Sequence, residues 1–217
     1  MHADEAIRTP QFWLLWAALC LTVMAGIGVL GQASPMIQEL VPGALTARSA
    51  AGFVVLLGVA DVLGRFIWSS ASDAIGRRST YAIFFALGAA LYTLAPRSGQ
   101  MGNVVMFVAF CCAIMSIHGG GFATIPAYVR DQFGAMHVGA IHGRLLTAWS
   151  LAGVAGPVLV NYIREYQVAH GVAKADAYSM TMYLMAGLLV IGFVANWLIR
   201  PVHPKHHFTP DRDVARD

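Results

Sequence analysis

Two ionisable residues, Asp61 and Arg65, lie inside an apolar stretch of the sequence that runs from Gly58 to Arg78. They are four positions apart, which places both side chains on one face of a helix and within reach of an ion pair. A charge at the centre of a lipid bilayer costs about 2.5–3.5 kcal/mol on insertion scales, so such residues normally face a protein interior or a water-filled path. The chemistry open to this pair is proton exchange at the carboxylate, or binding of a carboxylate by two parallel hydrogen bonds from the guanidinium.

The spacing leaves two interpretations of Asp61 open. In the first, Asp61 exchanges a proton or releases Arg65 when a ligand arrives. In the second, it is a permanent counter-charge that only makes the insertion of Arg65 into lipid tolerable. Replacing Asp61 by Asn separates the two interpretations, because only proton exchange at Asp61 predicts that the pH dependence of uptake changes.

Further candidates to line a site are His118 and three aromatic residues. His118 directly precedes the triplet Gly119–Gly121 in a long uncharged stretch. It is either a hydrogen-bond donor or protonatable group near neutral pH, or a histidine that a neighbouring helix satisfies. Trp149, Trp68 and Tyr128 could form an aromatic lining for a small anion. For Trp68 and Tyr128 the alternative is an anchor at the membrane interface, where such residues are common, whereas Trp149 is expected to lie deeper.

The composition requires a membrane to surround these residues. Hydrophobic residues make up 58% of the 217 positions and charged residues only 12%, against about 25% charged in ordinary soluble domains. The mean hydropathy is +0.63. With so little polar surface, the chain is predicted to be an integral membrane protein. The net charge of +3 is small and its basic residues lie between apolar segments, so a nucleic-acid partner is not expected.

Six segments are long and apolar enough to cross the hydrocarbon core, or nearly so, since a crossing takes about 20 residues. The third is the shortest, and the second is interrupted by Asp61 and Arg65. The predicted fold is an all-α bundle of six transmembrane helices over residues 9–200, with residues 1–8 before it and a mobile tail over 201–217. The segments lie near Phe12–Met36, Ala50–Ser72, Thr80–Ala95, Val104–Ala127, Leu145–Ile163 and Tyr178–Ile199.

The protein is expected in the inner membrane of the cell. The distribution of its basic residues predicts that both termini lie in the cytoplasm. His142 and Arg144, at a helix entrance, fit the same topology, and the acidic N-terminus MHADEAIRTP does not resemble a cleavable signal. With this orientation four basic residues face outward: Arg48, Arg97, Arg164 and Lys174. Nine face the cytoplasm: Arg8, Arg77, Arg78, Arg130, Arg144, Arg200, Lys205, Arg212 and Arg216.

Small residues recur at the spacing that lets membrane helices approach closely, and they predict a tight bundle. They include Gly119–Gly121, Gly26 with Gly28, and Ala152 with Gly156. The cysteines lie in apolar runs without metal-ligand spacing, which indicates packing residues. No cofactor or metal is predicted, and a solvated tail accounts for the three histidines His203, His206 and His207.

From Ser69 to Arg78 the sequence has the pattern S-x-x-S-D-x-x-G-R-R. It resembles the loop signature of the major facilitator superfamily, G-x-x-x-D-x-x-G-R-R/K, with Ser69 where glycine is usual. Gly76 permits a tight turn. Asp73, Arg77 and Arg78 can form charge pairs with a neighbouring helix end that break when two halves of a transporter rock. The alternative interpretation is a charged loop that only fixes topology.

Four stretches together resemble the carboxyl-terminal half of oxalate/formate antiporter-type members of that superfamily, from Thr9 to about Pro201. The resemblance implies helices seven to twelve of a twelve-helix secondary transporter, whose amino-terminal half is not in this sequence. The stretches are TPQFWLLWAALCLTVMAGIGVLGQASPMIQE, GRFIWSSASDAIGRR, GGGFATIPAYVRDQFG and GRLLTAWSLAGVAGP.

In that family an arginine on helix eight and a lysine on helix eleven are associated with the carboxylates of the substrate, and Arg65 falls on the helix-eight position. It precedes Arg77 by about 18 Å of helix, which predicts a depth near the bilayer midplane. Trp149 aligns with the helix-eleven lysine and carries no charge. With one cation missing, we expect the substrate to be a monocarboxylate and not oxalate.

The expected function is therefore secondary transport of a small organic anion, and no enzymatic motif such as H-E-x-x-H or G-x-S-x-G is present. Arg65, Trp149 and His118 would line the substrate site, with Asp61 as the coupling or counter-charge. The expected partners are the lipid bilayer and a second six-helix half, either a separate chain or a second copy. The alternative is a truncated or split bundle that does not transport, either a remnant or a partner-dependent subunit.

Overall fold

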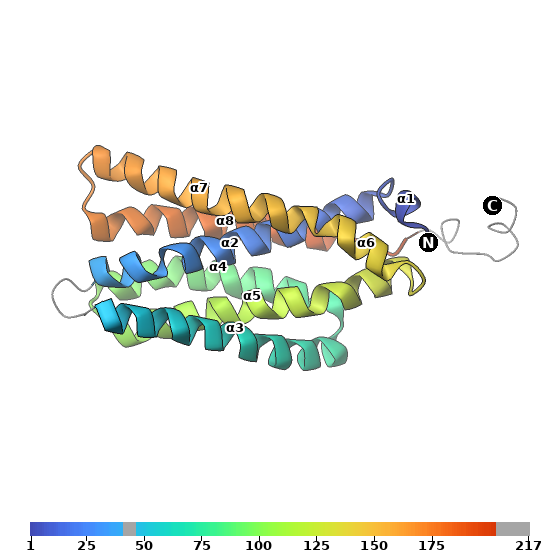
Figure 1. The fold of residues 1–217 in the computed structure, drawn as a ribbon, viewed down its shortest axis with the longest axis horizontal. Helices are drawn as coiled ribbons and strands as arrows, with labels where there is room; N and C mark the ends of the chain where they lie inside the picture. The colour runs from blue at the N-terminus through green and yellow to red at the C-terminus, as the bar shows by residue number, and fades with distance from the viewer. Residues whose placement is uncertain (41–46, 203–217) are drawn as a thin grey trace, which may run out of the picture.

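The computed structural model describes residues 1–40 and 47–202, and within these residues all regular structure is helical (Figure 1). Six spans in this part of the chain are long and apolar enough to cross a membrane, which confirms the predicted all-α bundle. The helices are α1 (Ala3–Ala6), α2 (Pro10–Leu40), α3 (Ala47–Ile75), α4 (Arg77–Gln100), α5 (Val104–Phe133), α6 (Val138–Leu145), α7 (Thr147–Ala169) and α8 (Lys174–Leu198).

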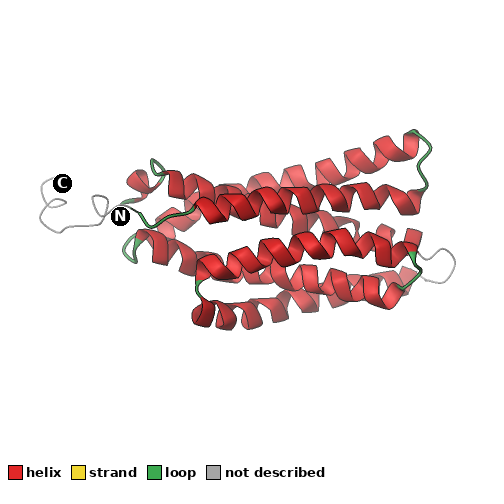
Figure 2. Cartoon of the chain, turned by 180° about the vertical axis from the view of Figure 1, so that it is seen from behind, coloured by secondary structure: helices red, strands yellow, loops and turns green. Residues whose placement is uncertain are grey.

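The long helices run up and down beside one another along the long axis of the molecule (Figure 1, Figure 2). α3 packs against α5, α4 packs against α5 and α8, and α2 packs against α7 and α8. Since the chain crosses the bundle six times, α1 and the end of α8 lie at the same end (Figure 1). The span of α3 and the span formed by α6 and α7 are the least covered, with 28% and 22% of their apolar windows buried.

The helices extend further into polar sequence than the apolar runs predict. α4 continues through Pro96 to Gln100, and its 24-residue span is longer than the 23-residue span Asp176–Leu198, so the third span is not the shortest. The fifth span begins earlier than predicted, as the separate helix α6, with Leu146 between it and α7. The physical reason is that hydropathy marks only the hydrocarbon core, whereas backbone hydrogen bonding continues the helix beyond it.

Glycines set the distance between α3 and α5. A Cβ atom at Gly119 would overlap the carbonyl oxygen of Asp61, and one at Gly64 would overlap the carbonyl oxygen of Ser116. On the other side of the bundle, a Cβ at Gly156 would lie 3.0 Å from the carbonyl oxygen of Met24. The tight packing predicted from the small residues is therefore confirmed, and it brings backbones into direct contact.

The interior is closed by apolar and aromatic side chains, among them two tyrosines whose hydroxyls are hydrogen-bonded. Tyr81 and Tyr92 are fully buried, and their hydroxyls donate to the backbone carbonyls of Gly121 at 2.7 Å and Ala25 at 2.6 Å. The cysteines pack in the same interior as free thiols: Cys20, Cys111 and Cys112. The predicted mobile tail begins at Pro201, but Val202 is buried in the core. The rest of the tail, with its histidines, lies outside the described residues.

Candidate functional site

Asp61 joins two basic side chains from two helices. Its Oδ2 accepts hydrogen bonds from Arg65 Nη2 at 2.8 Å and from Arg65 Nε at 3.2 Å. Its other oxygen, Oδ1, lies 2.8 Å from Nδ1 of His118 on α5. We call these three residues the charge cluster. The ion pair expected from the four-residue spacing is therefore present, and a histidine from another helix completes it.

The charge cluster lies midway along the helices that carry it. Asp61 is the central residue of α3, and His118 is next to the centre of α5. Arg65 is ten residues before the end of α3 at Ile75, or about 15 Å at 1.5 Å per residue. That Arg65 lies near the bilayer midplane stays a prediction.

Glycines allow the charge cluster to assemble. Because Gly64 and Gly119 bring α3 against α5, the carboxylate of Asp61 can reach the imidazole of His118 directly. On the opposite side, a Cβ atom at Gly26 of α2 would overlap the ring of His118. The imidazole thus occupies space that only a glycine on α2 leaves free.

The three members of the charge cluster differ in exposure. The side chains of Asp61 and His118 are 12% and 8% exposed, whereas Arg65 is 43% exposed on the open face of α3. Its guanidinium lies 5.0 Å from the ring centroid of Phe122, a cation–π contact. Arg65 therefore offers donors on the open face, whereas His118 is buried and contacts the opposite oxygen of Asp61.

Trp149 adjoins the charge cluster from α7. Its ring centroid lies 5.5 Å from that of His118 and 4.9 Å from that of Phe122, in an edge-on arrangement with the latter. Phe122 in turn contacts Arg65. The four residues expected to form a site, Arg65, Asp61, His118 and Trp149, are thus brought together by three helices.

A family model described as Major Facilitator Superfamily matches residues 15–216. The chain belongs to this family. It is 27% identical to the oxalate:formate antiporter of Oxalobacter formigenes over 159 residues, which cover 71% of this chain and 36% of that protein. It is also 27% identical to the uncharacterized MFS-type transporter YhjX of Escherichia coli (strain K12) over 153 residues, covering 69% and 36%. The chain thus spans about a third of the length of the curated relatives it matches.

The major facilitator loop signature forms the turn between α3 and α4. Gly76 has a φ of +87°, in the left-handed region that favours glycine. Arg77 pairs with Asp73 and donates to the hydroxyl of Ser72 at 2.7 Å, and its Nε lies 3.6 Å from Asp131 near the end of α5. The turn at Gly76 and a charge pair with a neighbouring helix end are therefore both present as predicted.

Arg78 of this major facilitator turn reaches the last turn of α8. Its guanidinium donates to the carbonyl oxygen of Trp197 and lies 5.5 Å from that ring centroid. Its own carbonyl accepts from Asn196 Nδ2 at 3.0 Å. The turn is thus tied to α5 through Arg77 and to α8 through Arg78.

Tyr128 occupies neither of the places expected for it, and Trp68 bridges two helices. Tyr128 is 3% exposed, and its hydroxyl donates to Asn196 Oδ1 at 3.1 Å between α5 and α8. It therefore neither lines the open face nor anchors the protein at a membrane interface. Trp68 is half-buried, and its indole N–H donates to the hydroxyl of Ser116 at 2.8 Å. Both residues hold helices together.

Sequence reasoning missed Phe122 and the function of Gly26 beside the imidazole. Phe122 lies four positions after His118, and this spacing on α5 was a usable signal that the two rings share a face. His142 lies on α6 outside the charge cluster, and Arg144 pairs with Asp4 at 2.5 Å. Across the described residues, no group of three or more His, Cys, Asp or Glu side chains is arranged to hold a metal ion.

Proposed function

We propose that this chain is a six-helix half of a secondary transporter that carries a small organic anion, most simply a monocarboxylate. The observation that carries the proposal is the guanidinium of Arg65, paired with Asp61 in the middle part of α3 and 43% exposed on the open face of that helix. An arginine at this depth is costly in lipid and marks a ligand path. Substrate sites of secondary transporters lie near the midplane between two bundles.

The surroundings of Arg65 suit one carboxylate. A guanidinium matches the two oxygens of a carboxylate with parallel hydrogen bonds, and Asp61 occupies only Nε and Nη2. Phe122 and Trp149 supply an aromatic wall beside it. Since Trp149 carries no charge where the family resemblance places a lysine, the second carboxylate of a dianion would lack a cation.

A second six-helix half completes the site in this proposal. α3 and α7 leave faces uncovered, and the matched relatives are about three times as long as the matched part. The partner is a separate chain or a second copy. A second copy that placed its Arg65 across the same cavity would supply the missing cation for a dianion.

We propose a cell inner membrane location with both termini in the cytoplasm. Of the basic residues that the sequence assigns to the cytoplasm, the described ones lie in or next to segments at the end of the bundle where α1 lies (Figure 1), which supports this orientation by the positive-inside rule. They are Arg8, Arg77, Arg78, Arg130, Arg144 and Arg200. At this end Asp73, Gly76, Arg77 and Arg78 form the gate, because their contacts with α5 and α8 would have to rearrange if α3 and α4 moved.

The test is binding, followed by uptake, of a panel of small carboxylates by the purified full chain in nanodiscs and proteoliposomes. Arg65→Ala should abolish both, whereas Arg97→Ala, a matched arginine near the end of α4, should leave both unchanged. Equal binding by Arg65→Ala and the parent would overturn the anchoring role. Binding without uptake would identify a partner-dependent subunit, and the absence of both would favour a bundle that does not transport.

A further inference from the structure

We infer that His118 is the proton site that couples anion binding to pH: its protonation draws Asp61 away from Arg65 and leaves the guanidinium for the anion. This inference rests on the proposed function and adds the coupling ion to it. Histidine is the side chain whose ordinary titration range lies between about pH 5 and pH 8. In the charge cluster, Asp61 contacts both His118 and Arg65, so a change in the charge of His118 can alter the ion pair of Arg65.

The first step is that Asp61 is shared. One oxygen of the carboxylate faces His118 Nδ1 at 2.8 Å, and the other accepts both bonds from Arg65. When His118 is neutral, Arg65 is the cation that neutralises Asp61. When His118 is protonated, two cations share the carboxylate of Asp61, and the ion pair between Asp61 and Arg65 weakens.

The second step is the total charge of the site. With His118 neutral, Asp61 and Arg65 sum to zero, so a bound monoanion would leave one uncompensated negative charge. With His118 protonated, the charge cluster carries +1, and a monoanion brings the sum to zero. Because uncompensated charge is costly at mid-depth, the site favours the anion and the proton together. In the described helices, the other Asp, Glu, Lys and Arg residues lie near the helix ends.

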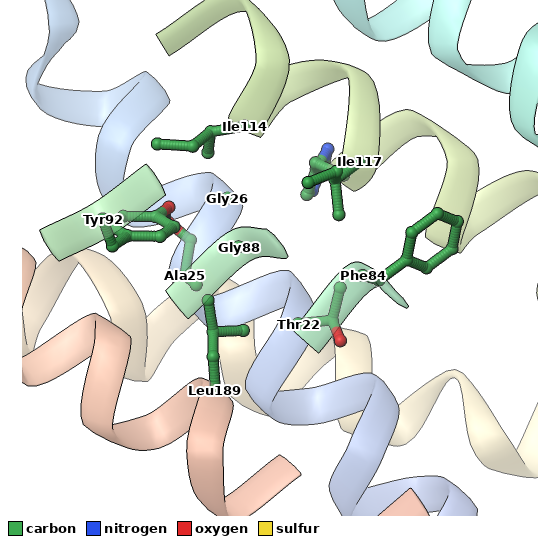
Figure 3. Close-up of a pocket in the computed structure, with 10 residues that line it drawn as sticks. Thr22, Ala25, Gly26, Phe84, Gly88, Tyr92, Ile114, Ile117 and Leu189 are labelled. Atoms are coloured by element: carbon green, nitrogen blue, oxygen red, sulfur yellow. Dashed lines mark hydrogen bonds between the residues drawn. The ribbon is translucent and has the colours of Figure 1, made fainter. Parts of the chain in front are cut away.

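The third step is access for the proton. His118 Nε2 is buried and has no hydrogen-bond partner among the described residues. The same imidazole forms part of the wall of a cavity of about 10 Å³, which has room for about one water molecule. Figure 3 shows this cavity, with the hydroxyls of Thr22 and Tyr92 between apolar side chains. The unpartnered nitrogen is therefore the atom that gains the proton.

Within residues 1–40 and 47–202, no other ionisable group that faces His118 competes for this function. From α3 the facing charges are Asp61 and Arg65. From α4 Tyr92 lines the same cavity, but its hydroxyl already donates to Ala25. The neighbours from the remaining helices do not titrate: Thr22 and Gly26 on α2, Trp149 on α7 and Leu189 on α8.

The test is the affinity of the full chain in nanodiscs for formate between about pH 5.5 and about pH 8.5, the range over which histidine titrates. We expect the apparent Kd to rise by up to about tenfold per pH unit once most of His118 is neutral, since only the protonated fraction is competent. His118→Gln, or His118→Asn if the former does not fold, should remove this slope. His142→Gln, on α6 outside the charge cluster, should retain it.

Two outcomes would overturn the inference and leave the proposed function standing. One is a parent that binds formate with the same Kd at every pH. The other is a slope that survives in both His118 variants, which would assign the proton to Asp61 and would be checked with Asp61→Asn. A parent that binds no carboxylate at any pH would instead overturn the proposed function.

Discussion

His118 Nδ1 lies 2.8 Å from Asp61 Oδ1, although the two residues are 57 positions apart in the chain. The same carboxylate accepts two hydrogen bonds from Arg65, so Asp61 links an imidazole on α5 to a guanidinium on α3. Gly64 and Gly119 allow α3 and α5 to approach closely enough for this contact. Four predictions follow from the charge cluster and the packing around it.

Gly119→Ala should lower the stability of the bundle. Its methyl group would overlap the backbone of α3 at Asp61, and overpacking of this kind costs about 1–3 kcal/mol. Thermal unfolding in detergent measures the loss. Gly153→Ala is the matched control, because a Cβ there meets nothing within 4 Å. Equal unfolding temperatures for the two variants would contradict the close packing of α3 on α5.

Arg65→Lys should weaken the binding of a monocarboxylate by at least about tenfold, even though the charge is retained. A lysine ammonium cannot donate the two parallel hydrogen bonds of a guanidinium to the anion. It also cannot replace the two hydrogen bonds that Arg65 donates to Asp61. Isothermal titration of the chain in nanodiscs measures the change. Arg97→Lys near the end of α4 should bind like the parent. A lysine variant with parental affinity would show that charge alone recognises the anion.

Trp149→Lys should shift the preference of the site toward a dicarboxylate. Trp149 reaches Arg65 through a single ring, that of Phe122, so a lysine there would provide a second cation for the second carboxylate. We expect the ratio of oxalate to formate affinity to rise by about tenfold or more, equal to about 1.4 kcal/mol.

Trp149→Leu is the control for this change in preference. It removes the aromatic ring without adding a charge, so it should not favour oxalate. If the leucine and lysine variants show the same preference, the position does not face the anion and the choice of a monocarboxylate loses its support.

Tyr128→Phe should destabilise the junction of α5 and α8 by a small amount. The hydroxyl donates to Asn196 Oδ1, and interhelical hydrogen bonds in membrane proteins average about 0.6 kcal/mol. Asn196→Leu should cost more, because Asn196 also donates to the carbonyl of Arg78 at 3.0 Å. Denaturant unfolding in mixed micelles would show this order. Tyr183→Phe, at an exposed tyrosine of α8, should have no effect.

Much of the architecture was predictable because it depends on local sequence. The length of each apolar run indicates a membrane span, and a four-residue separation places Asp61 and Arg65 on one face whatever surrounds the helix. The turn at Gly76 has the same local origin, since glycine favours the positive φ observed there. Helix ends were predicted less well, as at Pro96, because hydropathy marks only where the hydrocarbon begins.

The partners of each side chain were not predictable in the same way. Tyr128, expected on an aromatic lining or at an interface, is buried against Asn196, and Phe122, which was not singled out, contacts Arg65. Which face of a membrane helix meets its neighbour depends on the rotation of the helix about its axis. Because lipid is as apolar as the helix surface, the hydrophobic effect does not select one face, and composition alone does not predict this rotation.

The sequence by itself determined a six-span membrane bundle and an acid–base pair in the middle of its second span. Only the tertiary structure decided that His118 contacts that pair, that Trp149 lies beside His118, and that Arg65 remains on an open face. The physical reason is that the first set follows from the geometry of one helix. The second set follows from how closely the glycines of α2, α3 and α5 allow separate helices to approach.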